Sequence, residues 1–215
     1  MSVPVAASIA RSEFILGGQR SGKSRRAELL ARQWLDTNPA HQALMVATAQ
    51  PWDEEMRLRI ARHQGDRALR VPGMRTLEET QMLGEVLLAH SRPDTLIVVD
   101  CLTLWLTNLR MPATDLPDPA AEVSGQAPNH DALPEVPHDA QFEQACIAAL
   151  LDAIHRVPGP LVFVGNEIGL GVIPMGSQVR AFVDALGRLN QDVASACRRV
   201  TLMVAGLALT LKDMP

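Results

Sequence analysis

The sequence predicts an α/β fold, a three-layer sandwich in which helices cover both faces of a mostly parallel sheet. Short aliphatic runs recur along the chain without polar alternation, and segments with helical spacing separate them. Strands that are apolar throughout are typical of parallel sheets, because helical connections bury both faces of such a sheet. We expect a single domain over residues 1–215, since 47% of these 215 residues are hydrophobic, enough for one core.

The expected elements of the N-terminal half begin with a strand at 14–16, which runs into a glycine-rich loop. A helix from about residue 22 to 35 follows, and residues 43–48 form a second buried strand. Residues 53–64 carry apolar side chains at helical spacing, and Asp53 is placed to cap that helix.

The second half of the chain continues the alternation. The clearest strand has five core-type residues and ends on Asp100. The elements expected here are a helix at 76–90, strands at 95–100 and 161–164, a helix at 179–197, a strand at 200–204, and an additional edge strand at 207–211.

Charge and cysteine content bear on the class of partner. The formal net charge is -4, whereas proteins that grip nucleic acid usually carry a basic excess, so we expect small-molecule partners and no nucleic acid. Cys101, Cys146 and Cys197 are far apart in sequence, which favours buried thiols over a zinc site or a disulfide framework.

The ends and one internal stretch lack signs of packed structure. Residues 1–11 have no basic leading region typical of a signal peptide, and no apolar run reaches the roughly 18 residues of a membrane span, so we expect a flexible tail on a cytoplasmic protein. Residues 111–140 are rich in proline and acidic residues and hold no lysine or arginine. We interpret them as a flexible insertion without function, with a lid as the alternative.

The glycine-rich loop between the first strand and helix is a phosphate-binding motif. Its spacing, Gly-x4-Gly-Lys-Ser, lets backbone N–H groups surround phosphate oxygens at a helix N-terminus. Only Lys23 and Lys212 are lysines among the 20 Lys and Arg residues, so a lysine at this position is unlikely to be a chance occurrence. The nucleotide-binding candidates are Gly17, Gly18, Gln19, Arg20, Ser21, Gly22, Lys23 and Ser24. This motif specifies the expected fold further as that of the P-loop NTPases, RecA-like.

Two oxygen-bearing side chains are candidates for Mg²⁺ binding. The Ser24 hydroxyl follows the loop lysine, and Asp100 ends an apolar strand, where its carboxylate could orient Mg²⁺ directly or through water. The alternative for Asp100 is a residue that simply caps the next turn.

Several stretches together go beyond a generic phosphate loop. They are residues 17–25 (GGQRSGKSR), 47–49 (ATA), 53–56 with 59–63 and Arg67, 99–108 (VDCLTLWLTN) and 166–174 (NEIGLGVIP), with 187–191 and 204–207 fitting the same picture. In these stretches the chain resembles the bifunctional adenosylcobinamide kinase / adenosylcobinamide-phosphate guanylyltransferase family of cobalamin biosynthesis. The resemblance runs from about residue 14 to 212, apart from the acidic insertion.

The resemblance implies two reactions at one site. ATP or GTP phosphorylates the aminopropanol hydroxyl of adenosylcobinamide, and GTP then donates GMP to the phosphate through a guanylyl-histidine at the matching residue, His63. A neutral imidazole is a competent nucleophile toward phosphorus, and Arg59, Arg62 and Arg67 could offset the developing charge. The family also implies a homo-oligomer, a trimer whose subunits share each site.

Other residue roles also follow from the resemblance. Ala47, Thr48 and Ala49 are expected to line the nucleotide site together with Arg67. Glu78 falls near the position of a guanine-binding acid, with Glu79 as an equally reachable alternative and a solvated charge as another. Asn166 and Glu167 are expected to contact substrate or Mg²⁺, or to make structural hydrogen bonds instead. Trp105 either covers the corrinoid or belongs to the core.

Three features of the sequence depart from the family pattern. Met74 stands in the neighbourhood where a tryptophan is usual, within a slightly longer loop, which leaves the alignment of Glu78 open by about a residue. The N-terminal extension and the acidic insertion also differ from a minimal member. Two other functions remain as alternatives: a different small-molecule kinase with a phosphate loop, and a GTP-dependent switch or binding module.

Overall fold

The computed structural model describes residues 9–51, 53–111 and 139–214. Residues 1–8, most of the expected tail, and residues 112–138, nearly all of the expected insertion, lie outside the described residues. Among the described residues, no helix is long and apolar enough to cross a membrane.

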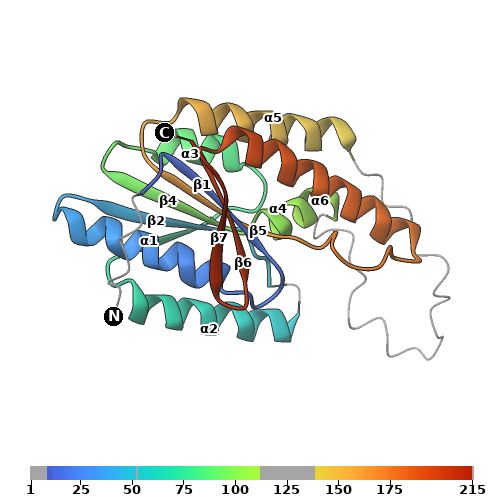
Figure 1. Ribbon diagram of the computed structural model, residues 1–215, viewed down its shortest axis with the longest axis horizontal. Coiled ribbons are helices and arrows are strands. Elements are labelled where there is room, and N and C mark those ends of the chain that lie inside the picture. Colours follow the sequence, from blue (N-terminus) through green and yellow to red (C-terminus); the bar gives the residue numbers. More distant parts are fainter. Residues whose placement is uncertain (1–8, 52, 112–138, 215) are drawn as a thin grey trace.

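A seven-stranded sheet in the order β3-β2-β4-β5-β1-β6-β7 forms the middle of the molecule (Figure 1). Every pairing is parallel except the antiparallel one between β6 and β7. The strands are β1 (Ser12–Gly17), β2 (Gln42–Ala47), β3 (Arg75–Glu78), β4 (Thr95–Asp100), β5 (Leu161–Asn166), β6 (Arg199–Val204) and β7 (Leu207–Asp213).

Helices lie on both faces of the sheet, which confirms the three-layer α/β sandwich (Figure 1). One apolar cluster joins α1 to the sheet, and a larger one packs α3, α4, α5 and α6 on the opposite face. Helix α2 lies outside α1 in Figure 1. The helices are α1 (Lys23–Thr37), α2 (Glu54–Arg70), α3 (Leu83–His90), α4 (Leu102–Arg110), α5 (Ala140–Arg156) and α6 (Ser177–Ala196).

The central strands form because both of their faces are covered. Residues 14–16 of β1 and 96–99 of β4 are buried without alternation, as parallel strands between two helical layers require. Asp53 caps α2 as expected: its carboxylate accepts a hydrogen bond of 2.7 Å from the Met56 backbone N–H. The edge strand expected at 207–211 is β7, which extends to Asp213.

The helix expected at 76–90 is wrong in its first part. Residues Arg75–Glu78 form β3, a short edge strand paired in parallel with β2, and α3 begins only at Leu83. The turn between them is stabilised by Glu79, whose carboxylate accepts from the backbone N–H groups of Gln81 and Met82 at 2.7 and 2.8 Å. Helices α4 and α5 were not expected from the sequence.

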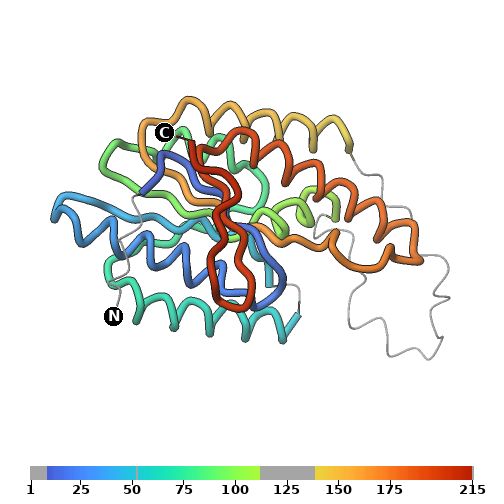
Figure 2. Tube along the Cα trace, in the orientation of Figure 1, coloured from blue at the N-terminus to red at the C-terminus, as the bar shows by residue number. Residues whose placement is uncertain are grey.

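The hairpin between β6 and β7 supports the loop that follows β1. Its two turn residues, Ala205 and Gly206, both have positive φ (51° and 80°), as a two-residue hairpin turn of this hand requires. The Gly206 N–H donates to the Ser21 carbonyl at 3.0 Å. In the tube view this hairpin, in red, lies beside the blue segment after β1 (Figure 2).

Candidate active site

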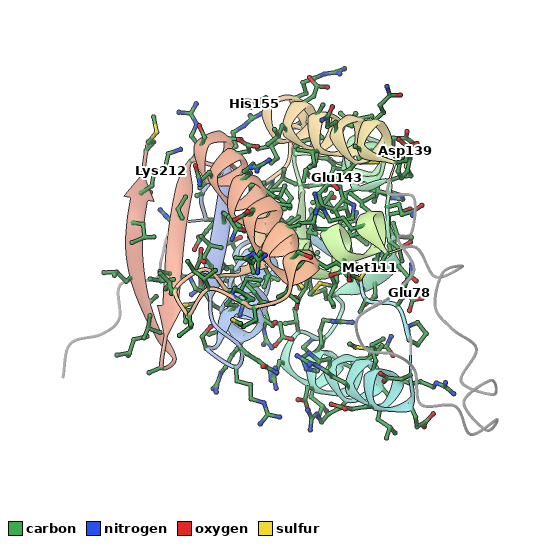
Figure 3. All side chains as sticks on the ribbon, turned by 90° about the vertical axis from the view of Figure 1, so that its right-hand side faces the viewer. Glu78, Met111, Asp139, Glu143, His155 and Lys212 are labelled. Atoms are coloured by element: carbon green, nitrogen blue, oxygen red, sulfur yellow. The ribbon has the colours of Figure 1, made fainter. Side chains whose placement is uncertain are left out.

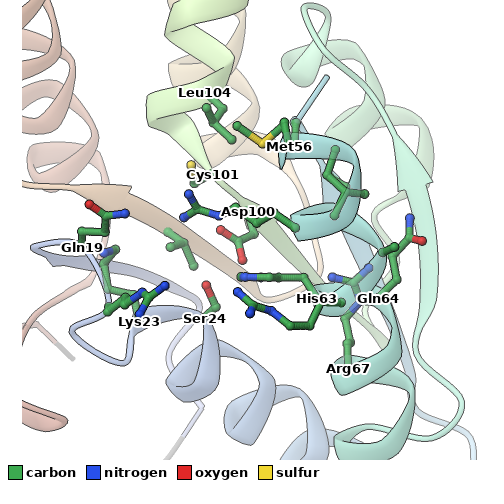
Figure 4. Close-up of a pocket in the computed structure, with 18 of the residues that line it drawn as sticks. Gln19, Lys23, Ser24, Met56, His63, Gln64, Arg67, Asp100, Cys101 and Leu104 are labelled. Atoms are coloured by element: carbon green, nitrogen blue, oxygen red, sulfur yellow. The ribbon is translucent and has the colours of Figure 1, made fainter. Parts of the chain in front are cut away.

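A cavity of about 1100 Å³, here called the main cavity, lies at the carboxyl ends of the central strands. It is lined by the loop after β1, by the ends of β2, β4 and β5, and by one side of α2. The carboxyl edge of an open parallel sheet is where α/β proteins bind ligands. In Figure 4, Lys23 and Ser24 lie on one side of this space, and His63 and Arg67 of α2 lie on the other.

The loop after β1 has the backbone shape of a phosphate cradle. Gly17 and Gly22 have φ values of +152° and +102°, which glycine adopts without strain. A Cβ on Gly17 would lie only 2.4 Å from the Met203 carbonyl oxygen, so a larger residue would push the loop away from β6. The buried Ser21 hydroxyl has no hydrogen-bond partner among the described residues, and the first turn of α1 holds no acidic side chain. These features leave donors and a helix dipole for an anion.

Lys23 stands at the start of α1 and reaches back over the loop. Its Nζ donates to the Gly18 carbonyl at 2.6 Å, and only 7% of the residue is exposed. Burial lowers the pKa of Lys23, the negative charge of Asp100 opposes that shift, and the positive charge of Arg59 adds to it. A buried ammonium beside a loop of backbone donors gains most from a phosphate partner.

Asp100 ends β4 and Cys101 follows it, and both line the main cavity together with the loop after β1. Strand β5 separates β4 from β1, so the sheet order brings Asp100 and the phosphate loop to the same edge. The Cys101 thiol is held protonated, because burial, and after it the charge of Asp100, raises its pKa to about 11. Nothing in the sequence marked Cys101 as a residue of the cavity wall.

Ser24 and Asp100 fit the chemistry of a Mg²⁺ site. Both line the main cavity, and a hydroxyl and a carboxylate are the hard oxygen ligands that this ion prefers. No group of three or more His, Cys, Asp or Glu side chains suited to a metal occurs within residues 9–51, 53–111 and 139–214. A Mg²⁺ ion here would therefore take most of its ligands from phosphates and water, as is usual for it.

His63 is exposed on α2 and lines the main cavity together with Arg59, Arg62 and Arg67. Residues 59, 62, 63 and 67 recur at helical spacing, so one face of α2 presents an imidazole among guanidinium groups. Arg67 is the buried member of the group, and its guanidinium donates to the Thr76 hydroxyl at 3.3 Å. The structure thus brings the predicted histidine to the same space as Lys23 and Asp100.

The three residues at the end of β2 differ in where they face. Ala47 and Ala49 line the main cavity, whereas Thr48 is fully buried. The Thr48 hydroxyl donates to the Cys101 carbonyl at 2.7 Å and accepts from the Cys101 N–H at 2.8 Å. Thr48 therefore ties the ends of β2 and β4 together behind the cavity surface.

The two candidate acids after β3 are in different environments. Glu78 lines the main cavity and is exposed, while the Glu79 carboxylate is engaged by backbone N–H groups at the start of α3. Figure 3 shows Glu78 on the side of the molecule opposite Lys212, consistent with β3 and β7 being the two edges of the sheet. Of the two acids, only Glu78 is free to meet a ligand in the cavity.

Of the remaining candidate residues, some line the main cavity and others make structural contacts. Asn166 lines the main cavity, while the Glu167 carboxylate accepts from the Gly169 N–H at 2.8 Å and stabilises the turn after β5. Trp105 is fully buried and its indole N–H donates to the Gln81 carbonyl at 2.7 Å, so it belongs to the core. Met56, Leu104 and Ile168 lie in the motif stretches without an expected role, and the structure shows them as apolar residues of the cavity wall.

Comparisons with known proteins cover nearly the whole chain. The family model described as cobinamide kinase / cobinamide phosphate guanyltransferase matches residues 13–211. The protein named bifunctional adenosylcobalamin biosynthesis protein CobP from Pseudomonas aeruginosa is 40% identical over 203 residues, which are 94% of this chain and 98% of that protein.

More distant relatives agree with this match. The proteins named bifunctional adenosylcobalamin biosynthesis protein CobU from Escherichia coli and Salmonella typhimurium are each 34% identical over 199 residues, 93% of this chain and 98% of theirs. Among solved structures, the flagellar accessory protein FlaH of Methanocaldococcus jannaschii has a TM-score of 0.47 and 11% identity, covering 96% of this chain and 80% of that one. That likeness is too distant to carry an argument.

Proposed function

The chain belongs to the cobinamide kinase / cobinamide phosphate guanyltransferase family, and we infer that its main cavity carries both of the transfers in that name. The protein is a bifunctional enzyme of adenosylcobalamin biosynthesis, a cobinamide kinase and a cobinamide phosphate guanylyltransferase. The observation that carries the shared-site assignment is that Lys23, Asp100 and His63 all line one cavity.

In the kinase reaction, the aminopropanol hydroxyl oxygen of adenosylcobinamide attacks the γ-phosphorus of ATP or GTP. The new O–P bond forms as the bond from the γ-phosphorus to the β-bridging oxygen breaks, the hydroxyl loses its proton, and a nucleoside diphosphate leaves. The loop backbone and Lys23 hold the β- and γ-phosphates, and the charge of Lys23 stabilises the leaving oxygen. The short contact between Lys23 and the loop supports this role.

In the guanylyl transfer, an imidazole nitrogen of His63 attacks the α-phosphorus of GTP. The N–P bond forms as pyrophosphate leaves, and a phosphate oxygen of adenosylcobinamide phosphate then displaces His63 to give adenosylcobinamide-GDP. Splitting the reaction means that a neutral imidazole, and not an anionic phosphate, attacks the triphosphate. The arginines beside His63 support the proposal, because they can neutralise charge on the transferred group.

Ser24 and Asp100 would hold Mg²⁺, which when bound neutralises phosphate charge and orients the triphosphate. Glu78 accepts hydrogen bonds from guanine N1–H and N2–H₂, a donor pair that adenine lacks. Its exposure to the main cavity supports this choice over Glu79. Arg67, Ala47 and Ala49 complete the nucleotide site, with Thr48 ordering the strand ends behind them.

The corrinoid half of the substrate requires a more apolar surface. Leu104 and Ile168 line the main cavity, with Asn166 beside them. We assign Asn166 to direct substrate contact and Glu167 to holding the turn that carries Ile168. The substrates of this cytoplasmic enzyme are thus small molecules, a corrinoid and nucleotides.

We also propose that the enzyme works as a homotrimer in which a neighbouring subunit completes each site. Leu170, Val172, Ile173 and Met175, in the loop after β5, are between 77% and 96% exposed. An apolar loop of this kind usually marks a protein interface. It continues directly from Ile168 in the cavity wall, so a subunit packed on it would adjoin the active site.

A two-stage assay tests the proposed function. Purified protein is incubated with Mg²⁺, ATP and adenosylcobinamide, GTP is then added, and the corrinoids are identified by mass. We expect adenosylcobinamide phosphate first and adenosylcobinamide-GDP with pyrophosphate second. Phosphorylation without the second product would leave a kinase alone, and GTP binding without either product would indicate a nucleotide-dependent switch.

A further inference from the structure

Helix α2 carries His63, yet it has almost no apolar attachment to the other described parts of the chain. Arg67 is its only buried residue, and its leucines at 58 and 69 are 64% and 83% exposed. A surface helix is ordinarily fixed by an apolar stripe against the core. The position of α2 must therefore depend on polar contacts and on the segments at its two ends.

One of these polar contacts joins α2 directly to the phosphate-loop helix. The Arg70 guanidinium donates to a Glu28 carboxylate oxygen on α1 at 2.7 Å, and its other nitrogen lies 3.0 Å from Asp66. Glu28 is only 5% exposed, whereas the Asp66 side chain is 49% exposed. A carboxylate this buried requires a cationic partner, so the Glu28 contact is the stronger of the two.

The spacing along both helices relates this ion pair to the reacting groups. Glu28 lies one turn after Ser24 on α1, and Arg70 lies two turns after His63 on α2, so each pair shares a helix face. A second cavity of about 360 Å³ lies between the two faces, and Ser24, Glu28, His63 and Arg70 all line it. The contact between Glu28 and Arg70 therefore fixes the position of His63 on α2 relative to Ser24 on α1.

We propose that the Glu28–Arg70 ion pair is a latch that positions His63 for attack on the α-phosphate bound at the phosphate loop. The proposal rests on the guanylyl-histidine step proposed above. Glu28 and Arg70 are positioning residues and touch neither substrate nor the transferred group. Because the kinase reaction does not use His63, the latch serves the guanylyl transfer alone.

The test uses the full-length protein and the variants Glu28→Gln, Arg70→Gln and the double variant. Asp36→Asn is the matched control, because it removes an exposed ion pair with Arg32 on the same helix α1, away from α2. The initial rate of protein labelling by GTP labelled at the α-phosphate is compared with the kinase rate. Hydrogen exchange of the backbone amides in residues 54–70 measures how readily helix α2 opens.

We expect each single variant to lower the labelling rate by about tenfold while the kinase rate changes by less than about threefold. The double variant should lose no more than either single variant, because the two side chains act through one contact. Exchange across residues 54–70 should accelerate in all three, and Asp36→Asn should match the wild type in every measurement.

Two results would overturn the latch: labelling and exchange that stay at wild-type values, or equal losses of both activities with a lowered melting temperature. The second pattern would mean that the ion pair stabilises the whole fold. If the wild-type protein binds GTP but never becomes labelled, the proposed guanylyl-histidine fails, and the exchange measurement still decides whether the ion pair holds α2.

Discussion

Lys23 and Lys212 are the only lysines of the chain, and they occupy opposite kinds of position. Lys23 is buried at the phosphate loop, while the Lys212 ammonium on the edge strand β7 donates to the carbonyls of Ala194 and Ser195 at the end of α6. In the proposed function the first position supplies a charge to the bound phosphates, whereas the second caps the end of α6. Comparing the two separates the role of a lysine in catalysis from its role in stability.

We expect Lys23→Ala to lower both the kinase and the guanylyltransferase rates by at least about 100-fold, because one charge stabilises the phosphates in both reactions. Initial rates with each substrate measure this. Lys212→Ala should leave both rates unchanged and lower only the melting temperature. Retention of either activity in Lys23→Ala would contradict a shared site.

Glu78 provides a test of base selection. Glu78→Gln should reduce the preference for GTP over a matching adenine nucleotide in nucleotidyl transfer by about 10- to 100-fold, since an amide both accepts and donates hydrogen bonds. The ratio of kcat/KM values for the two nucleotides measures it. Glu79→Gln is the control: it should destabilise the start of α3 and leave the ratio unchanged, and the opposite pattern would assign guanine to Glu79.

Among the helices and strands, the sequence predicted the ones whose residue pattern reflects burial. It missed the ones whose residue pattern does not. The central strands contain unbroken apolar runs, such as 96–99, and the glycine loop has a fixed spacing, so both are predictable from residues alone. Strand β3 is short, mostly exposed and followed by residues of helical character, so nothing local separates it from α3. Its strand conformation depends on pairing with β2, which is a tertiary interaction.

Helix α5 carried a signal that was available in the sequence. Asp139 caps it by accepting from the backbone N–H groups of residues 141 and 142, and apolar residues recur at 142, 146, 150 and 154. Helix α5 begins at the edge of the proline-rich stretch, and the proline-rich composition there obscured the helical pattern. The cavity residues differ in the same way: the phosphate-loop residues were predictable from their spacing, while Cys101 and Leu104 lie in a motif stretch whose place in the cavity required the fold.

The packing of α3 on α5 depends on one glycine. A Cβ on Gly84 would lie 2.6 Å from the backbone carbon of Ala149, closer than two such atoms can approach. Gly84→Ala should therefore lower the free energy of unfolding by about 1–3 kcal/mol, measured by denaturant titration. Gly187→Ala in α6 meets nothing within 4 Å and should be neutral or stabilising. Equal effects of the two substitutions would refute the close contact.

At the scale of the whole molecule, the strand order explains why distant segments form one site. Strands β1, β2 and β4 are separated in sequence by whole helices, yet their carboxyl ends meet at one edge of the sheet. The β6–β7 hairpin supports the phosphate loop from the side through Gly206. Helix α2 then lines the cavity from outside and carries His63, the proposed nucleophile.

The proposed homotrimer can be tested by the mass of the protein in solution. Light scattering of the purified protein should give a mass near three times that of the 23.3 kDa chain. Val172→Glu should reduce it to a single chain, because it places a charge on the apolar loop. Leu69→Glu, a similarly exposed but isolated leucine on α2, should leave the trimer intact. A wild-type protein that is monomeric at assay concentrations would contradict a site completed by a neighbouring subunit.

Guanylylation of His63 in the main cavity is the step on which the proposed transferase activity depends. The direct measurement is incubation with Mg²⁺ and GTP labelled at the α-phosphate, followed by denaturation and a count of protein-bound label in the wild type, His63→Ala and His155→Ala. His155, on α5 in Figure 3, is a control remote from the cavity. We predict label that is labile to acid, stable to base, present in the wild type and His155→Ala, and absent from His63→Ala. Label that persists in His63→Ala, or no label where GTP is shown to bind, would contradict guanylylation of His63.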